Sequence, residues 1–120
     1  MENELNASMT VLAAVEAAFR IDFELRCRKN NTEPLSNRFR RVRHGRMQHT
    51  ISFPQEILGI WEKEYPKSEE VIADLRKAFR FRNWLAHGRY WIPETGKIDY
   101  GDICALAESA FSALPREGLS

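Results

Sequence analysis

Hydrophobic residues recur at three- and four-residue steps along most of this chain, which is the spacing of one face of an α-helix. The first such stripe crosses an alanine-rich stretch that favours helix, and its members are Leu5, Met9, Leu12, Val15, Phe19 and Phe23. The pattern therefore predicts one long helix at the beginning of the chain.

An acidic residue, Asp22, interrupts the polar–apolar pattern of this first helix. It lies at the edge of the stripe, and Leu25 extends the apolar surface on the same side. A carboxylate enclosed by apolar side chains needs a partner, whereas a carboxylate at the edge of a stripe can reach water. Both interpretations are open, and the first makes Asp22 a candidate partner for a buried cation.

A shorter and strongly basic helix is predicted to follow the first. Residues 30–34 favour a turn by composition. Ser36 is then expected to cap the helix, with Phe39 and Val42 as its apolar anchors, and Gly45 is expected to end it.

Two further helices have clear start signals. The sequence 52–54 is typical of a helix start, because a proline in the first turn lacks only an N–H that would be unpaired anyway. Pro66 closes that helix. Ser68, followed by two glutamates, favours a second start because a hydroxyl cap and acids suit the positive helix end.

The last part of the chain is expected to hold a turn and a final helix. Residues 92–97 read as the tip of a small hairpin, and Asp99 can cap a helix that Pro115 stops. The chain is therefore predicted to be all-α: a single domain over residues 1–120, folded as an antiparallel bundle of four to five helices.

Composition agrees with one cytoplasmic domain and excludes few functions. The chain has 120 residues, of which 43% are hydrophobic and 29% charged, as in ordinary globular proteins. No apolar run has the length of a membrane span, and the N-terminus lacks a signal-peptide pattern. Cys27 and Cys104 have no metal-ligand spacing, so we expect reduced thiols, no metal and no cofactor.

Charge is distributed unevenly, although the formal net charge is only +1. From Arg26 through His49, eight Lys and Arg residues stand against Glu33 alone, which gives +7 and leaves −6 for the rest of the chain. A patch of this kind suits a polyanion such as RNA, although arginine-rich segments are also common as solvated faces. The predicted RNA-binding residues of this run are Arg38, Arg40, Arg41, Arg43 and Arg46.

The chemically most suggestive segment is 81–91, in which an Arg82-Asn83 pair precedes His87 and Gly88. Continuing the apolar stripe of the fourth helix places Arg82 where a core residue should point. A guanidinium there must be paired, extend to solvent or face a cavity. Asp22 is the expected internal partner and hence a supporting residue of the site.

These residue types suit metal-independent cleavage of RNA. His87 would move protons at the ribose 2′-hydroxyl or the leaving oxygen, and Arg82 would stabilise charge growing on the phosphate. Asn83 would orient the histidine or donate a hydrogen bond to the phosphate. Aromatic side chains such as Trp84 and Tyr90 can stack on bases. The structural alternative is that His87 caps the helix while Arg82 forms an ion pair.

One straight helix does not bring the two main candidates together. Five residues of helix place Arg82 and His87 roughly 140° apart around the axis. They can act on one ligand if the helix frays, if the arginine side chain curls round, or if two chains share the site.

The segment resembles the signature of the HEPN superfamily, in which an arginine and usually a polar residue precede a histidine. Arg82-Asn83-Trp84-Leu85-Ala86-His87 matches its common Arg-Asn form, and the small size and the helical bundle also agree. The resemblance implies a homodimer with two motifs facing across a cleft. It further implies a metal-independent endoribonuclease of toxin or defence type that leaves a cyclic phosphate, with Arg82 and His87 catalytic and Asn83 supporting.

Partners follow from the same resemblance. RNA is the expected substrate, and Arg89 and Tyr90 are expected to help bind it. In the branch of toxins that pairs with a nucleotidyltransferase antitoxin, a tyrosine stands two residues after the histidine, where this chain has Arg89 and then Tyr90. An antitoxin or nucleotidyltransferase partner is therefore an open expectation. A non-catalytic helical module that binds nucleotide, RNA or a protein partner is the alternative function.

Overall fold

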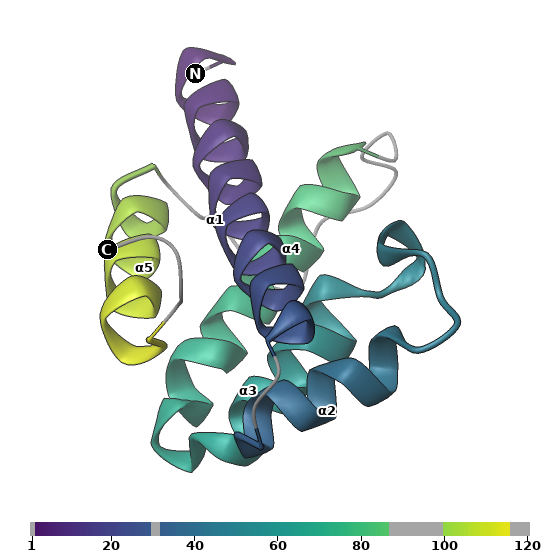
Figure 1. The fold of residues 1–120 in the computed structure, drawn as a ribbon. Helices are drawn as coiled ribbons and strands as arrows, with labels where there is room; N and C mark the ends of the chain where they lie inside the picture. The colour runs from purple at the N-terminus through teal and green to yellow at the C-terminus, as the bar shows by residue number, and fades with distance from the viewer. Residues whose placement is uncertain (1, 30–31, 87–99, 116–120) are drawn as a thin grey trace.

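The structure, a computed structural model, describes residues 2–29, 32–86 and 100–115 and contains only helices and turns within them (Figure 1). The α-helices are α1 (Glu2–Arg28), α2 (Pro34–Arg43), α3 (Leu58–Glu64), α4 (Glu69–Ala86) and α5 (Tyr100–Ala113). Three short turns join them: 3₁₀ turns η1 (Gln48–Thr50) and η3 (Pro66–Ser68), and a π-helical turn η2 (Phe53–Ile57). The prediction of an all-α helical bundle is confirmed.

Helix α1 is the element around which the others are arranged. It contacts α5, α2 and α4, and α4 and α5 also contact each other. Figure 1 shows α5 beside α1, α4 crossing behind α1, and α2 and α3 near the C-terminal end of α1. One continuous apolar core includes residues from all five helices. The predicted stripe supplies its centre, because Leu12, Val15, Phe19 and Phe23 are buried.

The predicted helix starts near residues 52 and 69 are confirmed. The Ser52 hydroxyl accepts a hydrogen bond from the Gln55 backbone N–H at 3.2 Å. The first turn after Ser52 is π-helical, and it leads directly into α3. Helix α4 begins at Glu69, immediately after Ser68, with two acids in its first turn.

The start of the basic helix differs from the prediction that Ser36 caps it. Helix α2 begins at Pro34 with Glu33 as the preceding residue, and no side chain caps it. Proline presets the backbone for a first helical position, so the helix begins three residues earlier than a cap at Ser36 implies, and Ser36 is buried inside it. The predicted end is confirmed, because the helix stops at Arg43 and Gly45 follows with φ +69°.

Expectations for the end of the chain have mixed outcomes. The hairpin at 92–97 and the cap at Asp99 lie outside the described residues. Helix α5 ends at Ala113, two residues before Pro115, as predicted. None of the helices described in the structure is both long and apolar enough to cross a membrane.

Candidate functional site

Arg82 lies near the end of α4, where its guanidinium is paired and partly exposed. Its Nη1 donates a hydrogen bond to Glu16 Oε1 at 2.8 Å. The guanidinium carbon lies 5.1 Å from the centroid of the Phe79 ring, within the range of a cation–π contact. The side chain is 29% exposed. Arg82 is therefore paired, stacked on an aromatic ring and accessible to a ligand.

The expected pairing of Arg82 with Asp22 is wrong. Asp22 Oδ1 instead accepts a hydrogen bond from Arg26 Nε at 3.0 Å, from a residue one turn further along α1. Arg82 reaches α1 at Glu16, six residues before Asp22, which is about 9 Å along a helix axis. Arg82 thus has an acidic partner on the first helix, but this partner is Glu16 and not Asp22.

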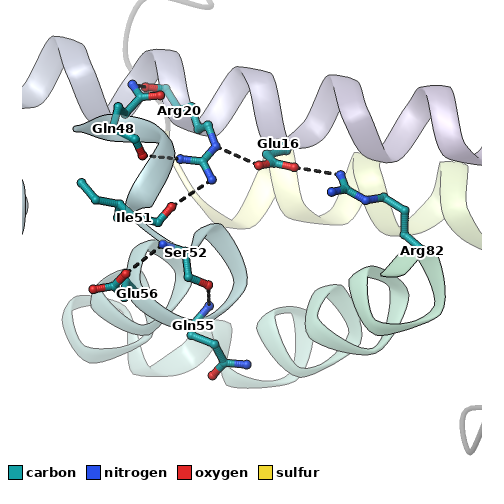
Figure 2. A network of polar contacts seen from close by, with 8 residues as sticks. All are labelled: Glu16, Arg20, Gln48, Ile51, Ser52, Gln55, Glu56 and Arg82. Carbon is teal, nitrogen blue, oxygen red and sulfur yellow. Dashed lines mark hydrogen bonds and ion pairs between the residues drawn. The ribbon is translucent and has the colours of Figure 1, made fainter. Parts of the chain in front are cut away.

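Glu16 joins two arginines from different parts of the fold (Figure 2). Its second oxygen, Oε2, accepts a hydrogen bond from Arg20 Nε at 2.8 Å. The other two nitrogens of Arg20 donate to the backbone carbonyls of Gln48 at 3.2 Å and Ile51 at 2.9 Å. Arg20 therefore holds η1 against α1, while Glu16 holds Arg20.

The carboxylate of Glu16 is stabilised in its ionised form. Burial opposes ionisation, but hydrogen bonds and positive charge from Arg20 and Arg82 outweigh that effect and lower the pKa of Glu16 below its ordinary value. At neutral pH the three side chains together carry two positive charges and one negative charge. The cluster is thus a net cation.

The two arginines differ in how many donors they have left. A guanidinium carries five N–H donors, and among the described residues Arg82 uses one of them, towards Glu16. All three nitrogens of Arg20 are engaged. Arg82 is therefore the arginine of this cluster that is equipped to bind an anion.

A pocket of about 360 Å³ opens beside this cluster. Its lining comes from α1, η1, the start of η2 and the end of α4, and comprises Glu16, Arg20, His49, Thr50, Ile51, Ser52, Phe53, Pro54, Phe79, Arg82 and Asn83. Both residues of the predicted Arg82-Asn83 pair therefore line this pocket.

The pocket also contains His49, which the sequence interpretation did not single out. His49 is an exposed residue of η1. No periodicity or motif surrounds it, and it reaches the site because Arg20, 29 residues earlier, holds the turn in place. A long-range contact of this kind has no local signal in the sequence.

Several predicted site residues cannot be placed in the pocket. His87, Arg89 and Tyr90 lie outside the described residues. Of the three proposed catalytic residues, the structure therefore describes Arg82 and Asn83.

Three of the five predicted RNA-binding arginines in the basic run form ion pairs with acids from other elements. Ion pairs join Arg38 to Glu64, Arg43 to Glu24 and Arg46 to Glu56. These acids come from outside the run, so the ion pairs join the basic part of the chain to its acidic part.

The other two predicted RNA-binding arginines of the run, Arg40 and Arg41, line one pocket on α2. Arg40 donates hydrogen bonds to the backbone carbonyls of Arg26 and Lys29 at 3.2 and 2.7 Å. Arg41 is exposed, and a shallow pocket beside it is lined by Asn37, Arg40, Arg41 and His44. Of the five predicted RNA-binding arginines in the run, Arg41 is the most open to a ligand.

Comparison with models of known protein families, with curated proteins and with solved structures finds no match to this chain. A functional proposal for this chain therefore rests on its own residues and on the motif.

Proposed function

We propose that this protein is a metal-independent endoribonuclease of the HEPN type. One observation carries the proposal: Glu16 fixes Arg82 at the edge of a polar pocket while most N–H donors of Arg82 have no partner among the described residues. A guanidinium held in this way can bind a phosphate group through two parallel hydrogen bonds. Asn83, which follows Arg82 and lines the same pocket, adds an amide for the phosphate or the ribose.

The proposed reaction is attack of a ribose 2′-hydroxyl on the neighbouring phosphorus. His87 removes the hydroxyl proton, the 2′-oxygen bonds to phosphorus, and the 5′-oxygen of the next nucleotide leaves and takes up a proton. Arg82 stabilises the negative charge that grows on the phosphate oxygens. The products are a 2′,3′-cyclic phosphate end and a 5′-hydroxyl end, and no cofactor takes part.

The site is proposed to be shared between two copies of the chain. On one straight helix Arg82 and His87 lie roughly 140° apart, so a homodimer lets Arg82 of one protomer act with the partner's His87. A strictly monomeric protein at micromolar concentration in analytical ultracentrifugation would contradict this arrangement. The resemblance to toxin and defence ribonucleases extends the proposal to a cytoplasmic role and to an antitoxin or nucleotidyltransferase partner.

The test is cleavage of RNA by purified protein in the presence of a chelator, with the product ends identified. We expect wild-type protein to produce 2′,3′-cyclic phosphate ends and His87→Ala to lose this activity. The variant, purified in the same way, controls for contaminating nucleases. If wild-type protein cleaves no faster than His87→Ala, the ribonuclease proposal is wrong.

A second candidate function is a non-catalytic module that binds nucleotide, RNA or a protein partner. The observation in its favour is the Glu16–Arg82 ion pair, which neutralises part of the charge that catalysis would use. The two functions differ in the assay above, because a binding module retains RNA or nucleotide without producing cyclic phosphate ends.

A further inference from the structure

The turn that carries His49 is held in place on both sides of the histidine. Arg20 donates to the carbonyl before His49, on Gln48, and to the carbonyl of Ile51 two residues after it. The Thr50 carbonyl accepts a further hydrogen bond from Arg46 at 2.9 Å. The backbone around this exposed imidazole is therefore fixed by side chains from outside η1.

One carboxylate sets the positions of both the turn and Arg82. Glu16 Oε2 orients Arg20, which holds the turn, and Glu16 Oε1 orients Arg82. His49 and Arg82 consequently line the same pocket although they are 33 residues apart in sequence. Figure 2 shows Glu16 between Arg20 and Arg82, so one carboxylate contacts lining residues of the pocket from two helices.

The lining of the pocket is suited to a phosphate group attached to a sugar. Arg82 offers hydrogen-bond donors that no other described residue uses, an imidazole can donate to a phosphate oxygen, and the cluster around Glu16 has a net positive charge. Thr50, Ser52 and Asn83 add neutral polar groups to the wall. A volume of about 360 Å³ lies within the range of small-ligand sites.

We infer that His49 is a phosphate-binding residue of this pocket, contacting the same nucleotide phosphate as Arg82. Glu16 and Arg20 act through the other residues, as positioning groups. The inference deepens the proposed ribonuclease function and rests on it for the identity of the ligand as RNA. Binding of a mononucleotide can nevertheless be measured without any cleavage.

The first experiment follows the imidazole NMR signals of the full-length protein during titration with adenosine 3′-monophosphate. We expect the signals of His49 to shift in a saturable manner. His44, an exposed histidine outside this pocket, reports binding of the anion at the surface that it shares with Arg40 and Arg41, and its signals should shift less than those of His49 at the same nucleotide concentration. Equal shifts at both histidines, or no shift at His49, would overturn the inference.

The second experiment compares variants by nucleotide affinity. His49→Ala should bind adenosine 3′-monophosphate roughly ten-fold more weakly, as expected for loss of a hydrogen bond to a charged group, and Arg82→Ala should remove the His49 shift. Arg80→Ala, which removes an exposed charge outside the pocket, should bind as wild type does. Because His49 is exposed, its substitution is not expected to unfold the protein, and circular dichroism verifies this. Wild-type affinity in folded His49→Ala contradicts the inference.

The outcomes separate this inference from the proposed function. If wild-type protein fails to cleave RNA but the His49 signals respond to the nucleotide, the ribonuclease proposal is wrong and the phosphate site remains. If wild-type protein cleaves RNA while the His49 signals do not respond and His49→Ala cleaves at the wild-type rate, the inference is wrong and the ribonuclease remains.

Discussion

Helix α1 contains two ion pairs in which an arginine follows an acid by four residues, and the two pairs have very different surroundings. In the pair Asp22–Arg26, the side chains are 0% and 5% exposed. In the pair Glu16–Arg20, the side chains are 22% and 21% exposed. The same local spacing therefore produces one buried and one half-buried cluster.

The buried pair connects parts of the fold. Arg26 also forms an ion pair with Glu33 ahead of α2, donates to the Pro115 carbonyl at 2.7 Å, and lies 5.3 Å from the Trp61 ring centroid. All three nitrogens of its guanidinium are engaged inside the protein. This cluster therefore stabilises the fold.

The half-buried pair instead borders a pocket. Glu16 forms hydrogen bonds with both Arg20 and Arg82. All three nitrogens of Arg20 are engaged, whereas most N–H donors of Arg82 have no partner among the described residues. The comparison shows that burial, which local sequence spacing does not reveal, separates a structural ion pair from one that can serve a ligand.

The largest expected effect is on stability. Asp22→Ala leaves the Arg26 charge buried with one acid fewer, so we expect a loss of about 3–5 kcal/mol in the free energy of unfolding. Glu16→Ala, at a partly exposed pair, should cost about 1 kcal/mol or less. Urea denaturation of both variants measures the difference. Equal losses would show that the two clusters do not differ as described.

A chemical test of burial on the same helix uses Cys27. Burial, followed by the negative charge of Glu24, raises the pKa of the Cys27 thiol from 9.0 to about 11. The thiolate fraction at pH 8 should therefore be about 100-fold lower than in an unstructured cysteine peptide, and alkylation correspondingly slower. A Cys104→Ser background isolates the signal. Alkylation at the rate of the peptide would contradict the burial of this face of α1.

A smaller effect is expected in the pH dependence of stability. Because the pKa of Glu16 is lowered in the folded state, its contribution is present above the unfolded value of about 4.3 and is lost as pH falls through the folded value. The stability difference between wild type and Glu16→Gln should therefore shrink as pH falls below about 4.3. Denaturation curves from pH 7 to pH 3 test this. A constant difference contradicts the role of Glu16.

The sequence predicted the helices and part of the site for identifiable reasons. Stripes such as the one through Phe19 and Phe23 directly encode burial at helical spacing, and the position of Arg82 on such a stripe made an acidic partner one of three expectations. The sequence did not reveal which acid, because both Glu16 and Asp22 stand on α1 at positions that periodicity alone cannot rank. The sequence did not reveal His49 as a site residue, because His49 reaches the pocket of Arg82 only through contacts between distant segments of the chain.

The error at Ser36 has a local cause. Both a hydroxyl cap and a proline in the first turn are valid start signals, and here the proline at residue 34 prevails. Ser36 is left inside α2, and its hydroxyl has no hydrogen-bond partner among the described residues.

The most direct test of the central claim measures RNA cleavage in chelator by wild type, Arg82→Ala and Arg80→Ala. Arg80 is an exposed arginine on the same helix that does not line the pocket, so its loss removes the same charge without removing the site. We predict that Arg82→Ala cleaves at least about 100-fold more slowly than wild type, that Arg80→Ala retains the wild-type rate, and that both variants stay folded. Equal rates for folded Arg82→Ala and Arg80→Ala would contradict the account.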